Sequence, residues 1–192
     1  MLTVHVLGPV EVRRDGRPLD LGGPQQRAVV AHLALDAGRV VSVERLIDRL
    51  WGESPPRTPL GTLQSYVSRL RRVVEPAREA GGAPRVLVSE APGYVLQVPT
   101  EQVDVHRFRS LVAEGRAVVT ADPAAAVERF DEALGLWRGP AFAGVGPDET
   151  VRPIVVRLDE EHAAAMEDRF DALLALGRHG EVIPALQQAV VD

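Results

Sequence analysis

Four polar side chains recur at helical spacing within residues 58–75, which read TPLGTLQSYVSRLRRVVE. In a helix that advances roughly 100° per residue, Ser65, Ser68, Arg69 and Arg72 fall on one side. A guanidinium group is a planar fork that binds phosphate oxygens or the O6 and N7 atoms of guanine, and a serine hydroxyl bonds either kind of acceptor. The pattern is typical of a helix that binds DNA, although the same residues also fit a solvated, arginine-bearing surface helix.

Apolar residues occupy the opposite side of this expected helix. The stripe consists of Leu60, Leu63, Val67, Leu70 and Val74. Gln64 and Arg71 flank it on one edge and Tyr66 on the other. Such a helix can bury its stripe in a small domain and present its polar side to phosphates and base edges.

The segments before this helix predict a small sheet followed by two shorter helices. Alternating apolar residues indicate a strand over residues 2–6, and a hairpin over residues 10–21 turns at Asp15-Gly16. Helical spacing then predicts helices over residues 25–36 and 43–51, the second capped by Ser42 and stopped by Gly52. The next loop contains Pro55 and Pro56, which favour a stiff extended chain, and the third helix starts with Thr58 as its cap and Pro59 at its first position.

A second hairpin follows the third helix. Residues 85–89 and 94–98 alternate in hydrophobicity, and Pro92-Gly93 lies at the turn between them. The order of sheet, three helices and hairpin predicts an α+β winged helix-turn-helix in which a four-stranded N-terminal sheet precedes the helices. The third helix is then the reading helix and the hairpin is the wing.

Residues 101–192 predict helices only. Helices are expected over residues 104–120, 122–137 and 151–176, with another beginning after Gly180. Alternating small and large apolar residues resemble tetratricopeptide-like helical pairs, without a clean repeat of the roughly 34 residues typical of such arrays. The last helical pattern is still running at residue 192, so we expect this domain, residues 101–192, to be truncated at its C-terminus.

The two halves of the chain carry opposite charge. All 22 basic residues are arginine; residues 1–100 hold 13 of them against 10 acids, a net of +3, and residues 101–192 hold 9 against 17, a net of −8. This asymmetry indicates a basic nucleic-acid-binding module, residues 1–100, joined to an acidic module. The chain has no cysteine, no apolar run of membrane-spanning length and no signal-like start, so we expect a cytoplasmic protein without membrane contact.

The sequence indicates no catalytic or metal site. The acidic run Asp159-Glu160-Glu161-His162 lacks a second histidine at ligand spacing, and we interpret it as a solvated helix face. We therefore expect no enzyme activity, no metal and no cofactor. Trp51 and Trp137 are expected to anchor the core.

Several longer motifs carry a specific resemblance. They are LGPVEV, GPQQRAVVAHLAL, VSVERLIDRLWGESPPRT, LQSYVSRLRRVVE and PGYVL in the first half, and VDVHRF, ERFDEALGLWRGPAF and LDEEHAAAMEDRFDALLALGRHGEVIPAL in the second. The first half resembles the OmpR-type winged-helix output domain, and the second resembles the bacterial transcriptional activation domain. From end to end, the chain is similar to the antibiotic-regulatory activators of actinobacteria, the SARP family.

The resemblance implies a transcription activator for a secondary-metabolite gene cluster that binds direct repeats in double-stranded promoter DNA. A second copy would occupy the adjacent repeat, and the bound protein would recruit RNA polymerase. The implied DNA-binding residues are Gln64, Ser65, Ser68, Arg69, Arg71 and Arg72, with Arg85 as the nearest cation for the wing. The implied contact with the sigma factor of RNA polymerase consists of Glu53, Ser54, Pro55, Pro56, Arg57 and Thr58. The wing tip itself, residues 89–93, carries an acid and no cation, which departs from a minor-groove contact.

One alternative comes from a different class of protein. In a protein-interaction adaptor, the helical half would bind partners and the winged helix would dock protein instead of DNA. Phosphate contacts make the logarithm of affinity fall linearly with the logarithm of salt concentration, so salt-sensitive DNA binding separates the activator from the adaptor.

Overall fold

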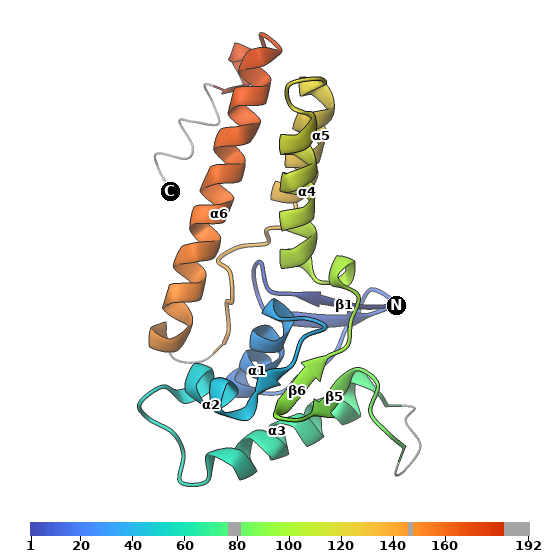
Figure 1. Cartoon of the computed structure of the whole chain (residues 1–192), viewed down its shortest axis with the longest axis vertical. Helices are drawn as coiled ribbons and strands as arrows, with labels where there is room; N and C mark the ends of the chain where they lie inside the picture. The colour runs from blue at the N-terminus through green and yellow to red at the C-terminus, as the bar shows by residue number, and fades with distance from the viewer. Residues whose placement is uncertain (77–81, 146–147, 183–192) are drawn as a thin grey trace. The chain divides into compact units, whose positions relative to one another are not determined.

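The computed structural model describes residues 1–76, 82–145 and 148–182 (Figure 1). The chain forms two compact units. The first consists of residues 1–106 and 138–156, and the second of residues 107–137 and 157–192. Among the described residues, no helix is long and apolar enough to cross a membrane.

The first unit begins with an antiparallel sheet of three strands, β1 (Leu2–His5), β2 (Glu11–Arg14) and β3 (Arg17–Pro18), in that order. The predicted turn is confirmed, because Asp15 and Gly16 both have positive φ, 50° and 78°. The prediction of four strands is wrong, because the described residues of this sheet form three. Pro18 has no N–H to continue the ladder, and Gly22, with a φ of 87°, turns the chain toward the first helix.

Three helices follow: α1 (Pro24–Leu35), α2 (Val43–Trp51) and α3 (Pro59–Val74). They pack against one another. Ser42 caps α2 as predicted, with its Oγ accepting from the backbone N–H of Arg45 at 3.2 Å. Thr58 precedes α3, but its side chain forms no capping bond; its backbone carbonyl accepts from the N–H of Thr62 at 3.0 Å.

A second antiparallel sheet holds the wing. Its strands are β4 (Val41–Ser42), β5 (Leu87–Glu90) and β6 (Gly93–Leu96), in the order β4-β6-β5. The sequence predicted β5 and β6 but not β4, which joins the wing to the start of α2. A Cβ at Gly93 would lie 1.8 Å from the carbonyl oxygen of Val41, so only glycine allows β6 to approach β4 this closely.

The segment after residue 137 returns to the first unit and lies along the end of β1. The backbone N–H of Phe142 donates to the carbonyl of Val6 at 2.9 Å, and that of Arg138 donates to Leu7 at 2.8 Å. Asp104 is buried beside them and accepts from the N–H groups of Val6 and Leu7 at 2.9 and 3.0 Å. Burial raises the pKa of Asp104 to about 6, against the lowering effect of these two bonds.

The second unit contains most of α4 (Asp104–Val118), all of α5 (Pro123–Leu134) and the C-terminal part of α6 (Asp148–Ala175). A short 3-10 turn, Thr100–Gln102, precedes α4. Asp122 caps α5, accepting from the N–H of Ala125 at 3.0 Å. Most of the helix expected after Gly180 lies outside the described residues.

The expected core tryptophans are half-buried and contact other rings. Trp51 lies 6.3 Å from Tyr66, and Trp137 lies 5.7 Å from Phe108, measured between ring centroids. Each therefore packs within its own unit.

Candidate nucleic-acid interface

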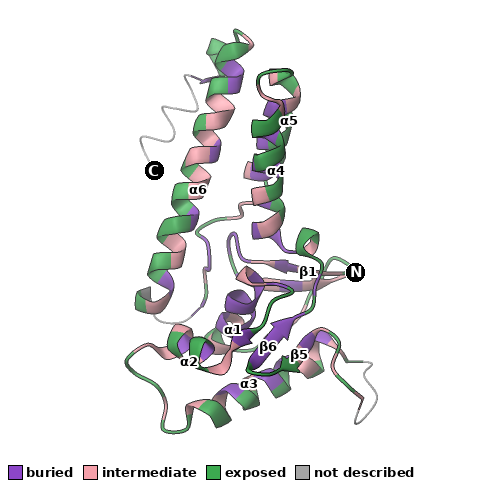
Figure 2. Cartoon of the chain, in the orientation of Figure 1, coloured by how far each residue is buried: buried purple, intermediate pink, exposed green. Residues whose placement is uncertain are grey.

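The two sides of α3 differ in burial as the sequence predicts, and Figure 2 shows the alternation along the helix. Leu63, Val67, Leu70 and Val74 are buried. Leu60 departs from the prediction, because 48% of its surface is exposed. It stands in the first turn, beside the exposed loop before α3, where the helical period continues but the core does not.

The polar residues of α3 line a shallow hollow on the surface. Its lining consists of Gly61, Gln64, Ser65, Ser68, Arg69 and Arg72. All six are exposed. The structure therefore brings together five of the seven residues predicted to bind DNA.

The arginines of this surface have no internal counter-charge. Among the described residues, Arg69 and Arg72 form no ion pair. The Ser65 hydroxyl donates to the carbonyl of Gly61 at 3.0 Å, which leaves its oxygen able to accept. An exposed face with unpaired guanidinium groups and small polar neighbours fits a polyanion.

Arg71 is held against the wing. Its Nε donates to the carbonyl of Leu87 at 2.7 Å, its Nη2 donates to Ser89 Oγ at 2.8 Å, and the guanidinium lies 6.0 Å from the centre of the Tyr94 ring. Tyr94 is buried. The contacts of Arg71 fix the wing relative to α3.

Arg85 lies at the base of the wing, away from the hollow on α3. Its backbone N–H donates to Glu75 Oε1 at 2.7 Å, and its side chain is exposed. Arg14 of β2 donates to the carbonyl of Val74, so the end of α3 is tied to the N-terminal sheet as well. The C-terminal end of α3 is thus joined to the N-terminal sheet by Arg14 and to the base of the wing by Glu75.

The loop of residues 53–58 is exposed except for Pro56, which is half-buried. The Ser54 N–H donates to the carbonyl of Trp51 at 2.9 Å, and the Trp51 ring packs near Tyr66 of α3. The loop is therefore anchored at its start and displays the remaining residues to solvent, next to the exposed Leu60.

The acidic run on α6 is only partly the solvated face that its sequence suggests. Asp159 and Glu160 are exposed, but Glu161 and His162 are half-buried. The His162 ring lies 4.4 Å from that of Trp137, and burial lowers the pKa of His162. Among the described residues, no group of three histidine or acidic side chains could hold a metal ion.

Sequence reasoning missed the contacts that join Asp104 and Arg138 to the end of β1. Arg138 Nη2 donates to the carbonyl of Pro9 at 2.9 Å and lies 3.9 Å from Asp104 Oδ2. Gly8, with a φ of 140°, stands where a Cβ would meet Arg138 Cβ at 2.9 Å. The only local signal of this junction in the sequence is the Gly8-Pro9 pair, which does not identify a partner.

Each half of the chain matches a known family of protein domains. Residues 16–96 match the model of the C-terminal domain of transcriptional regulatory proteins, and residues 103–192 match the bacterial transcriptional activator domain. The chain is 37% identical to the regulatory protein DnrI of Streptomyces peucetius, covering 96% of this chain and 70% of DnrI. It is 36% identical to the transcriptional regulator RedD of Streptomyces coelicolor, covering 98% of this chain and 54% of RedD.

A solved structure is similar to the whole chain. Mycobacterium tuberculosis EmbR, in complex with a low-affinity phosphopeptide, matches with a TM-score of 0.91 and 34% identity over 99% of this chain and 50% of the EmbR chain. The chain thus spans about half the length of EmbR and of RedD. The order of elements, the winged helix followed by helices, and the identity to DnrI and RedD lead to one conclusion: this chain belongs to the SARP family of transcriptional regulators.

Proposed function

We propose that the chain is a sequence-specific DNA-binding transcription activator that reads direct repeats near promoters. The observation that carries the proposal is the exposed hollow on α3, whose cations Arg69 and Arg72 have no ion pair among the described residues. In the major groove, one of these arginines binds a guanine edge and the other binds phosphate, and Gln64, Ser65 and Ser68 bind the remaining base edges and phosphates.

Arg71 and Arg85 have different roles in this proposal. Arg71 is a positioning residue, because its guanidinium joins α3 to the wing through Leu87 and Ser89. Arg85 supplies the charge at the base of the wing, where its exposed side chain binds a backbone phosphate. The wing therefore contributes orientation and charge more than base reading.

Activation rests on surfaces outside α3. The exposed loop of Glu53, Ser54, Pro55, Pro56, Arg57 and Thr58 contacts the sigma factor of RNA polymerase. The acidic second half, residues 101–192, contacts RNA polymerase or a second copy of the chain on the adjacent repeat. DNA binding belongs to residues 1–100, and residues 138–156 are packed into the same compact unit. The regulated genes form a secondary-metabolite cluster, as the family resemblance implies.

Footprinting on the promoter regions of the neighbouring genes tests the proposal. Protection of two direct repeats by the chain alone, with further protection toward the promoter when RNA polymerase is added, is the expected result. Identical footprints with and without polymerase would contradict recruitment, and no protection of any duplex would contradict DNA reading. Substituting residues 54–57 by glycine and serine should abolish the polymerase-dependent protection and leave the repeats protected.

A further inference from the structure

The second unit contains a cavity between α4 and α6 that the proposed function does not use. Its volume is about 530 Å³, within the ~300–1,000 Å³ typical of small-molecule sites. Apolar side chains line one part of it: Phe108, Val112, Ala113 and Ala164. Three arginines, Arg109, Arg116 and Arg157, and two acids, Glu160 and Glu161, line the rest. The lining thus has more arginines than acids, in a half of the chain whose net charge is −8.

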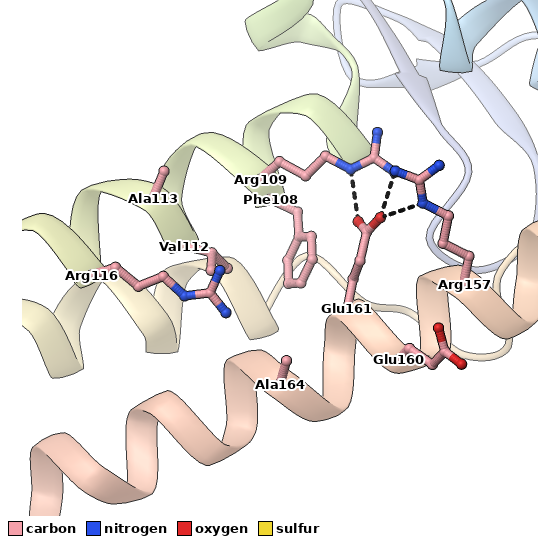
Figure 3. A pocket seen from close by; sticks show the side chains of 9 residues that line it. All are labelled: Phe108, Arg109, Val112, Ala113, Arg116, Arg157, Glu160, Glu161 and Ala164. Atoms are coloured by element: carbon pink, nitrogen blue, oxygen red, sulfur yellow. Dashed lines mark hydrogen bonds and ion pairs between the residues drawn. The ribbon is translucent and has the colours of Figure 1, made fainter.

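Two of the arginines share one carboxylate (Figure 3). Arg109 binds Glu161 with both arms of its fork, Nε to Oε2 at 2.7 Å and Nη2 to Oε1 at 3.0 Å. Arg157 Nε donates to the same Oε1 at 3.2 Å. One carboxylate cannot neutralise two guanidinium groups, so this cluster keeps one excess positive charge, although the arrangement brings two like charges together.

The remaining charges of the cavity do not cancel this excess locally. Arg116 is paired with Asp168, with Nε to Oδ2 at 2.6 Å. Glu160 also lines the cavity, but among the described residues it forms no ion pair with Arg109 or Arg157. Figure 3 shows the Glu160 carboxylate apart from the guanidinium groups of both arginines. A second anion near Arg157 would complete the cluster.

The apolar part of the cavity is formed in advance by ring contacts. The Phe108 ring packs edge-on against Trp137, with centroids 5.7 Å apart and planes at 82°. Trp137 in turn contacts His162 at 4.4 Å. Figure 3 shows Phe108 between Arg116 on one side and the Arg109–Glu161–Arg157 cluster on the other. An apolar body placed against Phe108 therefore has a guanidinium group within reach at either end.

We propose that this cavity binds a small organic anion with an apolar body and one carboxylate, sulfonate or phosphate group. The anion pairs with Arg157, and the apolar body covers Phe108 and Val112. The lining spans residues 108–116 and 157–164, a length of about 12 Å at the helical rise, which four residues of extended peptide would already fill. These dimensions favour a small molecule over a peptide segment.

The test uses 1-anilinonaphthalene-8-sulfonate, a fluorescent amphipathic anion, titrated into the full chain. Its uncharged analogue, N-phenyl-1-naphthylamine, has the same ring body without the sulfonate. We expect saturable binding of one anilinonaphthalene sulfonate per chain, displaced by decanoate, and weaker binding of the uncharged analogue.

Variants separate the cavity from other apolar surfaces. Arg157→Ala should weaken binding of the sulfonate about tenfold and leave the uncharged analogue unaffected, since a charge-assisted pair is lost. Ala113→Phe should block both probes by filling the mouth. Glu161→Gln should tighten sulfonate binding about threefold by removing the competing carboxylate. Arg129→Ala is the matched control, an exposed arginine of α5 that is paired with acids but does not line the cavity.

Equal affinity of the wild type, Arg157→Ala and Ala113→Phe for the sulfonate would overturn the proposal, as would the absence of saturable binding. Displacement of the sulfonate by an acidic peptide but not by decanoate would assign the cavity to a protein partner and would also overturn it. Far-UV circular dichroism of each variant shows that the fold is retained. None of these readouts involves DNA, so the result is independent of the proposed function.

Discussion

The arginines of α3 and those of the second unit carry the same charge but differ in their partners. Arg69 and Arg72 are exposed and, among the described residues, form no ion pair. Every arginine of the described second unit pairs with a carboxylate: Arg107, Arg109, Arg116, Arg129, Arg157, Arg169 and Arg178. An unpaired guanidinium keeps all its donors for an external anion, whereas a fully paired one mainly stabilises its own helix. Arg157 is intermediate, because it shares the Glu161 carboxylate with Arg109. Ion pairing, more than the number of charges, distinguishes the exposed side of α3 from the second unit.

Removing both unpaired arginines should have the largest effect. Arg69→Ala with Arg72→Ala should weaken binding to a promoter duplex by about 100-fold or more, because each contact contributes ~1–3 kcal/mol. Fluorescence anisotropy titration at fixed salt measures the change. The matched control, Arg116→Ala with Arg129→Ala, removes two paired arginines and should leave the affinity unchanged. Equal losses of affinity in the two double variants would contradict the assignment of DNA binding to the unpaired arginines of α3.

Acid should destabilise the first unit, because two of its histidines are held neutral by their surroundings. Burial, followed by nearby arginines, lowers the pKa of both His5 and His32 to about 4. The unfolded chain then binds more protons than the folded one between pH 6.5 and 4, so stability falls as the pH drops through that window. The raised pKa of Asp104 acts in the opposite direction below about pH 6.

His32→Leu isolates one of these groups. His32 is fully buried, and neither ring nitrogen has a hydrogen-bond partner among the residues that the structure describes. Between pH 7 and pH 5, the free energy of unfolding should fall by about 2 kcal/mol less in the variant than in the wild type. Urea unfolding at each pH measures it. Parallel pH profiles of the wild type and the variant would show that His32 is not held neutral by burial.

A paired cluster should affect stability and not DNA affinity. Glu161→Ala leaves the half-buried Arg109 without its bidentate partner and should lower the free energy of unfolding by about 1 kcal/mol. Promoter affinity should not change. Glu160→Ala, the neighbouring exposed acid, is the matched control and should leave stability nearly unaltered. A drop in DNA affinity for Glu161→Ala alone would assign part of the binding surface to the second unit.

Substitution of Arg71 should have the smallest effect of these variants. Arg71 is intermediate between the unpaired arginines of α3 and the paired arginines of the second unit. Although it belongs to α3, its contacts with Leu87 and Ser89 resemble those of a structural arginine. Arg71→Ala should reduce promoter affinity only severalfold, by loosening the wing, and Ser89→Ala should reproduce part of that loss. If Arg71→Ala equals Arg72→Ala in affinity and salt dependence, Arg71 contacts DNA directly.

Local signals predicted the helices well and the contacts between segments poorly. The bounds of α2 follow from the Ser42 cap and Gly52, and both are observed. Strand β4 was missed because two residues carry no periodicity, and its pairing with β6 depends on residues about fifty positions away. The helical period placed Leu60 in the buried stripe and Arg71 at the edge of that stripe. It cannot show where the core ends or that Arg71 is bonded to the wing.

The salt dependence of promoter binding tests the central claim most directly. For the wild type, the logarithm of affinity should fall linearly with the logarithm of salt concentration. The variant of Arg69 or Arg72 that loses a phosphate contact should have a slope shallower by about 0.9, and Arg157→Ala should have the wild-type slope. A wild-type affinity that does not depend on salt, or slopes that change equally in the α3 and α6 variants, would contradict the account and favour a protein-interaction adaptor.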